Sequence, residues 1–198
     1  MIKFIKLKKD TPYLILKEKY DEACSKGQKN IEAIAISSYN KGNAEVESRF
    51  VNLKFVEGDE FIFFSNYNSP KSVAFKSHDQ ISALIYWGSI NTQIRIKAKV
   101  KKKSAKYNQE YFEARSIDKN ALAISSAQSE LASSYETVVK NYNEAYKKED
   151  LSKCPEYWGG FSFIPYNFEF WEGNENRLNK RESFTLVNKE WTHSILQP

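Results

Sequence analysis

Apolar and polar residues alternate along several stretches of the chain, and this period of two predicts β-strands. The clearest case is segment 91–103, where four apolar residues alternate with three basic ones: Ile94, Ile96, Ala98 and Val100 with Arg95, Lys97 and Lys99. Further strands are predicted, with turns at 40–43, 57–60 and 188–189, over 31–39, 45–56, 60–66, 80–87, 159–173 and 182–196.

Four segments carry helical signals instead. Residues 12–26 are amphipathic, with Pro12 near the start and Gly27 just past the end. Segment 69–78 opens with Ser69 as a possible N-cap and Pro70 at the first helical position. Helices are also predicted over 105–116 and over 127–148, the latter from apolar residues three or four apart: Leu131, Tyr135, Val138, Tyr142 and Tyr146.

The order of these elements predicts a mainly β fold with helices, of the α+β class. Most strands follow one another through short turns, and two helical segments come late, so there is no βαβ rhythm. We therefore expect an antiparallel barrel or sheet with attached helices. The 198 residues show no internal repeat or linker, which indicates one domain over residues 1–198.

Charge and hydropathy indicate which kinds of partner the protein would bind and where in the cell we expect it. The formal net charge of +5 modestly favours an anionic partner, such as a phosphorylated small molecule, nucleic acid or a membrane surface. No apolar run approaches the roughly 18 residues of a membrane span, and the N-terminus lacks a signal-peptide pattern. We expect a soluble, cytoplasmic protein that does not bind a membrane.

The cysteines and histidines give no metal or disulfide pattern. Cys24 and Cys154 belong to no C-x-x-C pair, which favours free thiols in a reducing compartment. His78 and His193 have no partner at metal-ligand spacing, so no metal site is expected.

Common catalytic and nucleotide-binding motifs are absent: there is no G-x-G-x-x-G, no P-loop and no G-x-S-x-G. The basic run 97–106 could bind nucleic acid, but no aromatic residues interleave with it, and an exposed strand end is the preferred interpretation. What remains is a scattered set of phosphate-binding side chains at strand and helix ends: Arg49, Lys54, Ser65, Asn66, Ser69, Lys71, Gln93, Arg95, Tyr111 and Arg115.

Seven short motifs in order resemble the pyridoxine/pyridoxamine 5'-phosphate oxidases, which are FMN-dependent homodimeric split-barrel enzymes. RFVNLK (49–54) resembles the family's R-x-V-L-L-K, FFSNYNSPK (63–71) its F-Y-T-N-x-x-S-R-K, and QIRI (93–96) its Q-V-R-V. YFEAR (111–115), AQS (127–129) and YWGGF (157–161) are similar to Y-F-x-S-R, Q-S and W-G-G. EFWEGNENRLNKR (169–181) resembles E-F-W-Q-x-x-x-x-R-L-H-D-R, and the resemblance extends from about residue 12 to the C-terminus.

The resemblance implies an antiparallel split β-barrel and an oxidase. FMN would accept a hydride from pyridoxamine or pyridoxine 5'-phosphate to give pyridoxal 5'-phosphate, with O2 as the electron acceptor. The enzyme would be a homodimer with FMN sites at the subunit interface. The implied FMN contacts are Arg49, Lys54, Phe64, Ser65, Lys71, Gln93, Gln128 and Ser129, with Trp171 and Arg181 from the partner subunit. The implied substrate contacts are Lys54, Tyr111, Arg115, Lys119, Arg177 and Asn179, of which Arg177 and Asn179 would be catalytic.

Several residues depart from the family pattern. Asn179 stands where the family has histidine, Lys180 where it has an acid, and Glu172 where it has glutamine. Pro70 replaces an arginine next to Lys71, and Lys119 replaces a serine at the substrate phosphate. The N-terminal segment is also short compared with the family pattern, so we expect less N-terminal cover over the site.

These departures leave two alternatives open: a related FMN-dependent oxidase with a different, phenazine-type substrate, or a non-enzymatic flavin- or pyridoxal-phosphate-binding protein. Alternation along a strand through 177–181 predicts that Arg177, Asn179 and Arg181 point to one face.

Overall fold

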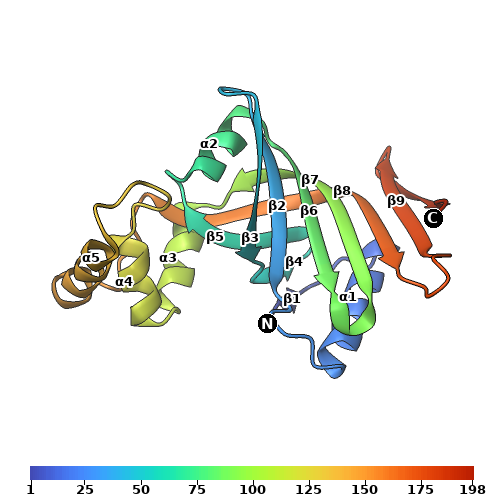
Figure 1. Ribbon diagram of the computed structural model, residues 1–198, viewed down its shortest axis with the longest axis horizontal. Coiled ribbons are helices and arrows are strands. Elements are labelled where there is room, and N and C mark those ends of the chain that lie inside the picture. The colour runs from blue at the N-terminus through green and yellow to red at the C-terminus, as the bar shows by residue number, and fades with distance from the viewer.

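The computed structural model describes residues 1–198 and has one ten-stranded sheet with helices attached (Figure 1). The strands are β1 (Lys3–Ile5), β2 (Ala33–Asn40), β3 (Glu45–Asn52), β4 (Phe55–Glu57), β5 (Glu60–Asn66), β6 (Gln80–Trp87), β7 (Thr92–Lys102), β8 (Trp158–Glu172), β9 (Lys180–Val187) and β10 (Glu190–Ile195). The helices are α1 (Thr11–Ser25), α2 (Pro70–Ser77), the 3-10 helix η1 (Gly88–Ile90), α3 (Ala105–Glu113), α4 (Ile117–Ser125) and α5 (Tyr135–Lys148).

The strands follow one hydrogen-bonded path, β1-β4-β5-β8-β7-β6-β2-β3, and β9 pairs with β8 and β10. Every pairing is antiparallel except β1 with β4. The two ends of the path, β1 and β3, do not pair with each other, so the sheet curls without closing. The α+β class and the antiparallel split barrel are confirmed.

The long strand β8 organises this sheet. One edge of β8 pairs with β7 along its length, whereas the other edge pairs first with β5 and then, from Asn167 onward, with β9. The register against β7 shifts next to Pro165, which has no backbone N–H to donate and is tolerated at such a bulge. The single sequence run 159–173 therefore serves two different parts of the sheet.

The predicted strand 45–56 is wrong in one respect: the structure divides it into β3 and β4. The backbone N–H of Leu53 bonds to the Glu32 carbonyl, and that of Lys54 bonds to the Ile62 carbonyl. Before the break the chain pairs with β2, and after it the chain pairs with β5. The break therefore crosses the open side of the sheet. Lys54 lies at this crossing.

The barrel interior is the main core, a cluster of 27 buried residues that includes Tyr13, Trp87, Phe163 and Phe168. The strict alternation of β6 and β7 places one face of each strand in this core and leaves the other exposed. Helix α1 buries Tyr13 and Leu16, while α3 and α4 form a smaller cluster with the start of β8 around Phe112 and Trp158.

The helical predictions hold with two corrections. Helices α1 and α2 match their predicted spans, and Pro70 occupies the first turn after Ser69. Helix α5 begins at Tyr135 rather than at residue 127, because residues 126–134 form a loop that carries two of the motif residues. Helix α4 and strand β1 were not predicted.

Together α3, α4 and α5 project from the barrel as a helical arm at the opposite end of the molecule from β9 (Figure 1). No helix is long and apolar enough to cross a membrane.

Candidate functional site

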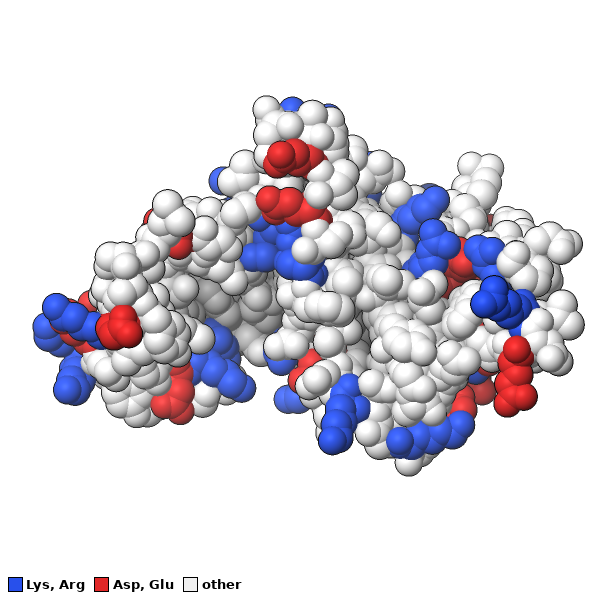
Figure 2. All heavy atoms as spheres, in the orientation of Figure 1, with Lys and Arg blue, Asp and Glu red and all other residues white.

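A cleft of about 1190 Å³ lies between the barrel and the helical arm, visible in Figure 2 with basic side chains at its borders. Its walls come from β3, the β3–β4 crossing, β5, the first turn of α2, the end of α3, the start of α4 and the α4–α5 loop. The split of the sheet and the arm thus create the cleft together.

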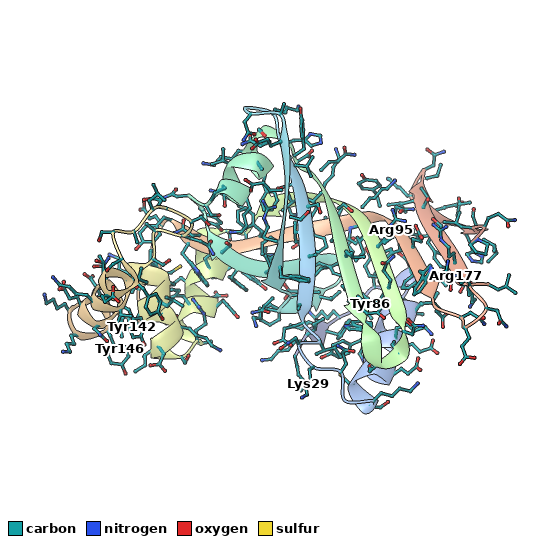
Figure 3. The ribbon with its side chains drawn as sticks, in the orientation of Figure 1. Lys29, Tyr86, Arg95, Tyr142, Tyr146 and Arg177 are labelled. Carbon is teal, nitrogen blue, oxygen red and sulfur yellow. The ribbon has the colours of Figure 1, made fainter.

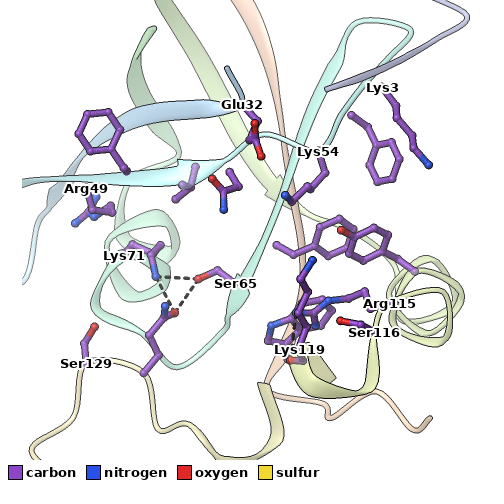
Figure 4. A pocket seen from close by; sticks show the side chains of 18 of the residues that line it. Lys3, Glu32, Arg49, Lys54, Ser65, Lys71, Arg115, Ser116, Lys119 and Ser129 are labelled. Carbon is purple, nitrogen blue, oxygen red and sulfur yellow. Dashed lines mark hydrogen bonds between the residues drawn. The ribbon is translucent and has the colours of Figure 1, made fainter. Parts of the chain in front are cut away.

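Cations predominate in the cleft lining. Six lysine and arginine side chains face two glutamates: Lys3, Arg49, Lys54, Lys71, Arg115 and Lys119 against Glu32 and Glu47. The close-up in Figure 4 shows the labelled basic residues in two groups on opposite sides of the cleft. Arg49 and Lys71 lie on one side, and Lys54, Arg115 and Lys119 on the other. Such an excess creates a positive potential that favours an anionic ligand.

Lys71 is the buried cation of the first group. Its Nζ donates to the Ser65 hydroxyl at 2.8 Å, the Ser69 hydroxyl at 3.0 Å and the Gln128 amide oxygen at 2.9 Å. None of these partners carries a charge, and the side chain is only 7% exposed. Burial is the main cause that lowers the pKa of Lys71 to about 8, and the positive charge of the nearby Arg49 adds to it.

Arg49 belongs to the edge strand β3. In the cleft it lies next to Lys71 of helix α2. One Nη atom donates to the Ser38 hydroxyl at 2.7 Å and to the Ile36 carbonyl at 3.2 Å, which ties the guanidinium to β2. The other donates to Glu47 at 2.6 Å. Because Arg49 and Glu47 are two residues apart on one strand, they project from the same face of β3.

The second group is less shielded by acids. Burial lowers the pKa of Lys54, and the cations Lys119 and Arg115 lower it further, with Glu32 opposing them. Arg115 packs over Trp158, with its Cζ atom 4.3 Å from the ring centroid, and donates through Nη2 to the Lys119 carbonyl at 3.3 Å. Its Nη1 atom is buried without a hydrogen-bond partner.

Aromatic rings line the cleft next to this second group. Phe64 and Tyr111 stack with centroids 3.6 Å apart, and Phe64 is also nearly parallel to Trp158 at 5.3 Å. Burial raises the pKa of the Tyr111 phenol, so it keeps its proton at neutral pH and can donate a hydrogen bond.

Ten of the predicted site residues meet in this cleft although they are spread over 81 sequence positions: Arg49, Lys54, Phe64, Ser65, Lys71, Tyr111, Arg115, Lys119, Gln128 and Ser129. Sequence reasoning missed the contributions of Trp158 and Glu47. Trp158 lies in the W-G-G motif but carried no assigned role, and nothing in the sequence marks Glu47 as a partner of Arg49.

The other predicted residues lie elsewhere. Gln93, Trp171 and Arg181 form a row across β7, β8 and β9, where Gln93 is the register partner of Trp171 and Trp171 that of Arg181. Cross-strand partners point to the same side of a sheet, so the three side chains share one face. None of them lines the cleft of the same chain.

The alternation predicted for Arg177, Asn179 and Arg181 is wrong. Strand β9 begins only at Lys180, and Arg177 and Asn179 lie in the β8–β9 turn. Arg177 has a φ of 59°, and the Asn179 side chain accepts a hydrogen bond from the Asn174 backbone at 3.0 Å. Glycine and asparagine in 173–176 favour this turn, which ends the strand pattern.

Arg177 is exposed near the end of the molecule that lies away from Tyr142 and Tyr146 of the arm (Figure 3).

Two departures from the family pattern compensate each other. Glu172 and Lys180 are register partners on β8 and β9, and their charged groups lie 3.7 Å apart. Glu172 also accepts from Lys19 of α1 at 2.7 Å. Glu172 therefore ties α1 to the sheet, whereas Lys180 pairs with Glu172 and Glu182, and both residues lie outside the cleft.

Sequence relatives resemble the chain over most of its length. A pyridoxine/pyridoxamine 5'-phosphate oxidase of Legionella pneumophila (strain Lens) is 36% identical over 155 residues, covering 77% of this chain and 72% of the relative. The chain belongs to the pyridoxine/pyridoxamine 5'-phosphate oxidase family. The oxidase of Colwellia psychrerythraea is 31% identical over 192 residues, 95% of this chain and 87% of the relative. Residues 158–198 match the family's "Pyridoxine 5'-phosphate oxidase C-terminal dimerisation region".

Solved structures share the fold. PhzG from Burkholderia lata 383, crystallised in complex with tetrahydrophenazine-1-carboxylic acid, superposes with a TM-score of 0.89 at 22% identity over 94% of this chain and 92% of that one. A pyridoxamine 5'-phosphate oxidase-related, FMN binding protein from Nostoc punctiforme gives a TM-score of 0.78 at 11% identity, covering 96% and 99% of the two chains. At these identities the likeness concerns the split-barrel architecture.

Proposed function

We propose that this family member is an FMN-dependent oxidase. It converts pyridoxamine or pyridoxine 5'-phosphate to pyridoxal 5'-phosphate with O2 as the electron acceptor, and it works as a homodimer in the cytoplasm. The observation that carries the proposal is the cleft with two groups of cations on opposite sides (Figure 4). FMN and the substrate each bring one phosphate of charge near −2, and each phosphate needs its own cations.

The first group suits the FMN phosphate. Lys71 is a buried ammonium whose hydrogen-bond partners are all neutral, from Ser65, Ser69 and Gln128. Glu47 is the nearby acid but bonds to Arg49, so Lys71 has no directly bonded counterion. A buried charge in that position is costly, and a bound dianion would supply the missing charge. With Arg49 beside it, Lys71 offers the combination of ammonium and guanidinium donors that phosphate accepts.

The second group suits the phosphate of the substrate. Arg115 has a buried Nη1 atom without a partner. Burial lowers the pKa of Lys54, and Lys119 and Arg115 lie close enough to lower it further. The protonated Tyr111 adds a neutral donor. The cleft volume of about 1190 Å³ exceeds the roughly 300–1,000 Å³ of a typical small-ligand site, which favours two ligands side by side.

A second copy of the chain would complete the site. Gln93, Trp171 and Arg181 share the outer face of the sheet with apolar side chains that are unusually exposed, Tyr86 at 57% and Phe50 at 76%. Exposed apolar residues that gather on one face of a sheet are typical of a protein interface. The match to the dimerisation region covers β8, β9 and β10, which carry Trp171 and Arg181. In a two-fold dimer this row would face the partner's cleft.

In this arrangement bound FMN would supply the redox chemistry by accepting a hydride from the C4' carbon of the substrate. The residues of the chain would bind FMN and the substrate and orient them toward each other. Arg49 and Lys71 would hold one phosphate, and Lys54, Arg115 and Lys119 the other. Arg177 and Asn179 would reach the substrate from the second copy. Asn179 can donate a hydrogen bond through its free amide nitrogen but cannot exchange a proton at neutral pH.

Asn179 also motivates the second candidate, a related FMN-dependent oxidase with another substrate. Its carbonyl oxygen is already bonded to the Asn174 backbone, so only the amide nitrogen remains for a ligand. A substrate that needs no proton exchange at this position would suit such a site. The FMN site is the same under both candidates.

The visible spectrum of the purified protein tests FMN first. We expect a yellow protein, or one that takes up added FMN; a colourless protein that binds no FMN would contradict both oxidase candidates. Anaerobic mixing with pyridoxamine 5'-phosphate should then bleach the flavin spectrum. An unchanged spectrum in a protein that holds FMN would favour the related oxidase or a flavin-binding protein without this activity.

A further inference from the structure

Two motif residues, Arg95 of QIRI and Glu169 of EFW, have no role in the site described above. They are register partners on β7 and β8, on the face that also carries Gln93, Trp171 and Arg181 (Arg95 is labelled in Figure 3). Glu169 is only 8% exposed and is the single acidic residue among the buried polar side chains. A buried carboxylate is costly unless cations pair with it.

Glu169 is held between two arginines. Its Oε2 atom accepts from Arg95 Nη1 at 3.0 Å, and its Oε1 atom accepts from Arg181 Nε at 3.0 Å and Nη2 at 2.7 Å. The remaining Nη1 of Arg181 donates to the Gln197 carbonyl at 2.8 Å. All three nitrogen atoms of the Arg181 guanidinium are therefore bonded within the chain.

This contact determines where Arg181 points. An arginine on an exposed strand samples many rotamers, and ordering it when a ligand binds weakens the affinity. Here the folded chain orders the guanidinium in advance, next to its register partner Trp171. Two arginines against one glutamate still leave an excess positive charge, so the group keeps its attraction for an anion.

We infer that Glu169 is a positioning residue, which fixes the Arg181 guanidinium beside Trp171 in the orientation that meets FMN in the cleft of a second copy. This inference rests on the proposed function, because it concerns the contact of Arg181 with FMN. A purely structural Glu169 would stabilise the sheet and affect ligand binding equally with or without Arg181. The two roles are separable by experiment.

The experiment is a double-mutant cycle on the dissociation constant of FMN, measured by quenching of flavin fluorescence. Glu169→Gln should weaken binding about tenfold, the usual size for one charge-assisted hydrogen bond. In the Arg181→Ala background the same change should alter binding by less than about twofold, because no arginine remains to be positioned. Glu172→Gln is the matched control on β8, since Glu172 pairs with Lys19 and Lys180, and it should leave binding unchanged.

If Glu169→Gln weakened FMN binding by the same factor in the wild-type and in the Arg181→Ala protein, the inference would be overturned. A second measurement needs no ligand: the NMR signal of the Arg181 Nε–H group, assigned from its loss in Arg181→Lys. The signal should persist in Glu172→Gln and shift or disappear in Glu169→Gln. An unaltered signal in Glu169→Gln would also overturn the inference. If the wild-type protein binds no FMN, the proposed function fails, and this signal still decides whether Glu169 fixes Arg181.

Discussion

The Nζ atom of Lys71 lies 2.9 Å from the amide oxygen of Gln128, although the two residues are 57 positions apart in the sequence. Lys71 opens helix α2 on the barrel, and Gln128 belongs to the α4–α5 loop of the helical arm. Their contact joins the barrel to the arm next to Arg49 and Lys71, the first group of cations. It holds Lys71, the most buried cation of the cleft, where a phosphate would bind.

The first prediction concerns the pH dependence of FMN binding. Because the pKa of Lys71 is lowered to about 8, the ammonium loses its proton in the free protein as the pH rises through 8. A phosphate favours the charged form, so FMN affinity should fall about twofold between pH 7 and 8 and about fivefold between pH 8 and 9. Titrations from pH 7 to 9 measure this slope.

Riboflavin, which lacks the phosphate, provides the control for Lys71. Its affinity should change little over the same range, and Lys71→Met should weaken FMN binding while leaving riboflavin binding nearly unaltered. A parallel decline for both flavins would show that the pH effect arises from the fold and not from a phosphate contact.

The second prediction tests the shared site by mixing subunits. Lys71→Met damages the cleft and Arg177→Ala damages the β8–β9 turn, so each homodimer should be nearly inactive, the latter with FMN still bound. In a heterodimer one of the two sites combines the intact cleft of one chain with the intact turn of the other. Random re-association should therefore restore about a quarter of wild-type activity. No recovery in verified heterodimers would mean that cleft and turn do not belong to one site.

The third prediction concerns Lys119, which stands where the resemblance implies serine. Lys119→Ser removes one exposed cation from the second group, and an exposed charge pair contributes up to about 1 kcal/mol. The KM for pyridoxamine 5'-phosphate should therefore rise about three- to fivefold, with FMN binding unchanged. Lys106→Ser is the control, because Lys106 is an exposed lysine of α3 outside the cleft. A rise in KM of the same size in both variants would assign the effect to overall charge.

The fourth prediction concerns Asn179 in the β8–β9 turn. Asn179→His introduces a side chain that titrates near neutral pH, and kcat should rise by up to about 10²-fold with a new ionisation between about pH 6 and 7. FMN affinity should stay the same. An unaltered kcat and pH profile would show that proton exchange at this position does not limit the reaction.

The fifth prediction concerns stability. A Cβ atom at Gly159, near the start of β8, would overlap the Asn108 amide nitrogen and the Tyr67 hydroxyl, which are both buried against it. Gly159→Ala should lower the free energy of unfolding by about 2–4 kcal/mol, measured by urea denaturation. Gly88→Ala is the matched control, since its Cβ would meet the Tyr86 ring at an ordinary 3.6 Å. Equal stability of the two variants would contradict the close packing at Gly159.

The sequence alone determined several strands, the family and many of the residues that line the cleft. Alternation identified β6 and β7 almost to the residue, because each strand buries one face and exposes the other. The short motifs identified the family and ten residues that meet in the cleft, since their chemical types and spacing are local properties of the chain.

Other features were decided only by the tertiary structure. The break at Leu53 and Lys54 depends on hydrogen bonds to Glu32 and Ile62, two distant partners that no local pattern reveals. The β8–β9 turn interrupts an alternation that looked continuous in the sequence. The separation of Gln93, Trp171 and Arg181 from the cleft follows from strand pairing across the sheet. Long-range pairing and burial decide which side chains meet, and a sequence pattern specifies only what each segment can offer.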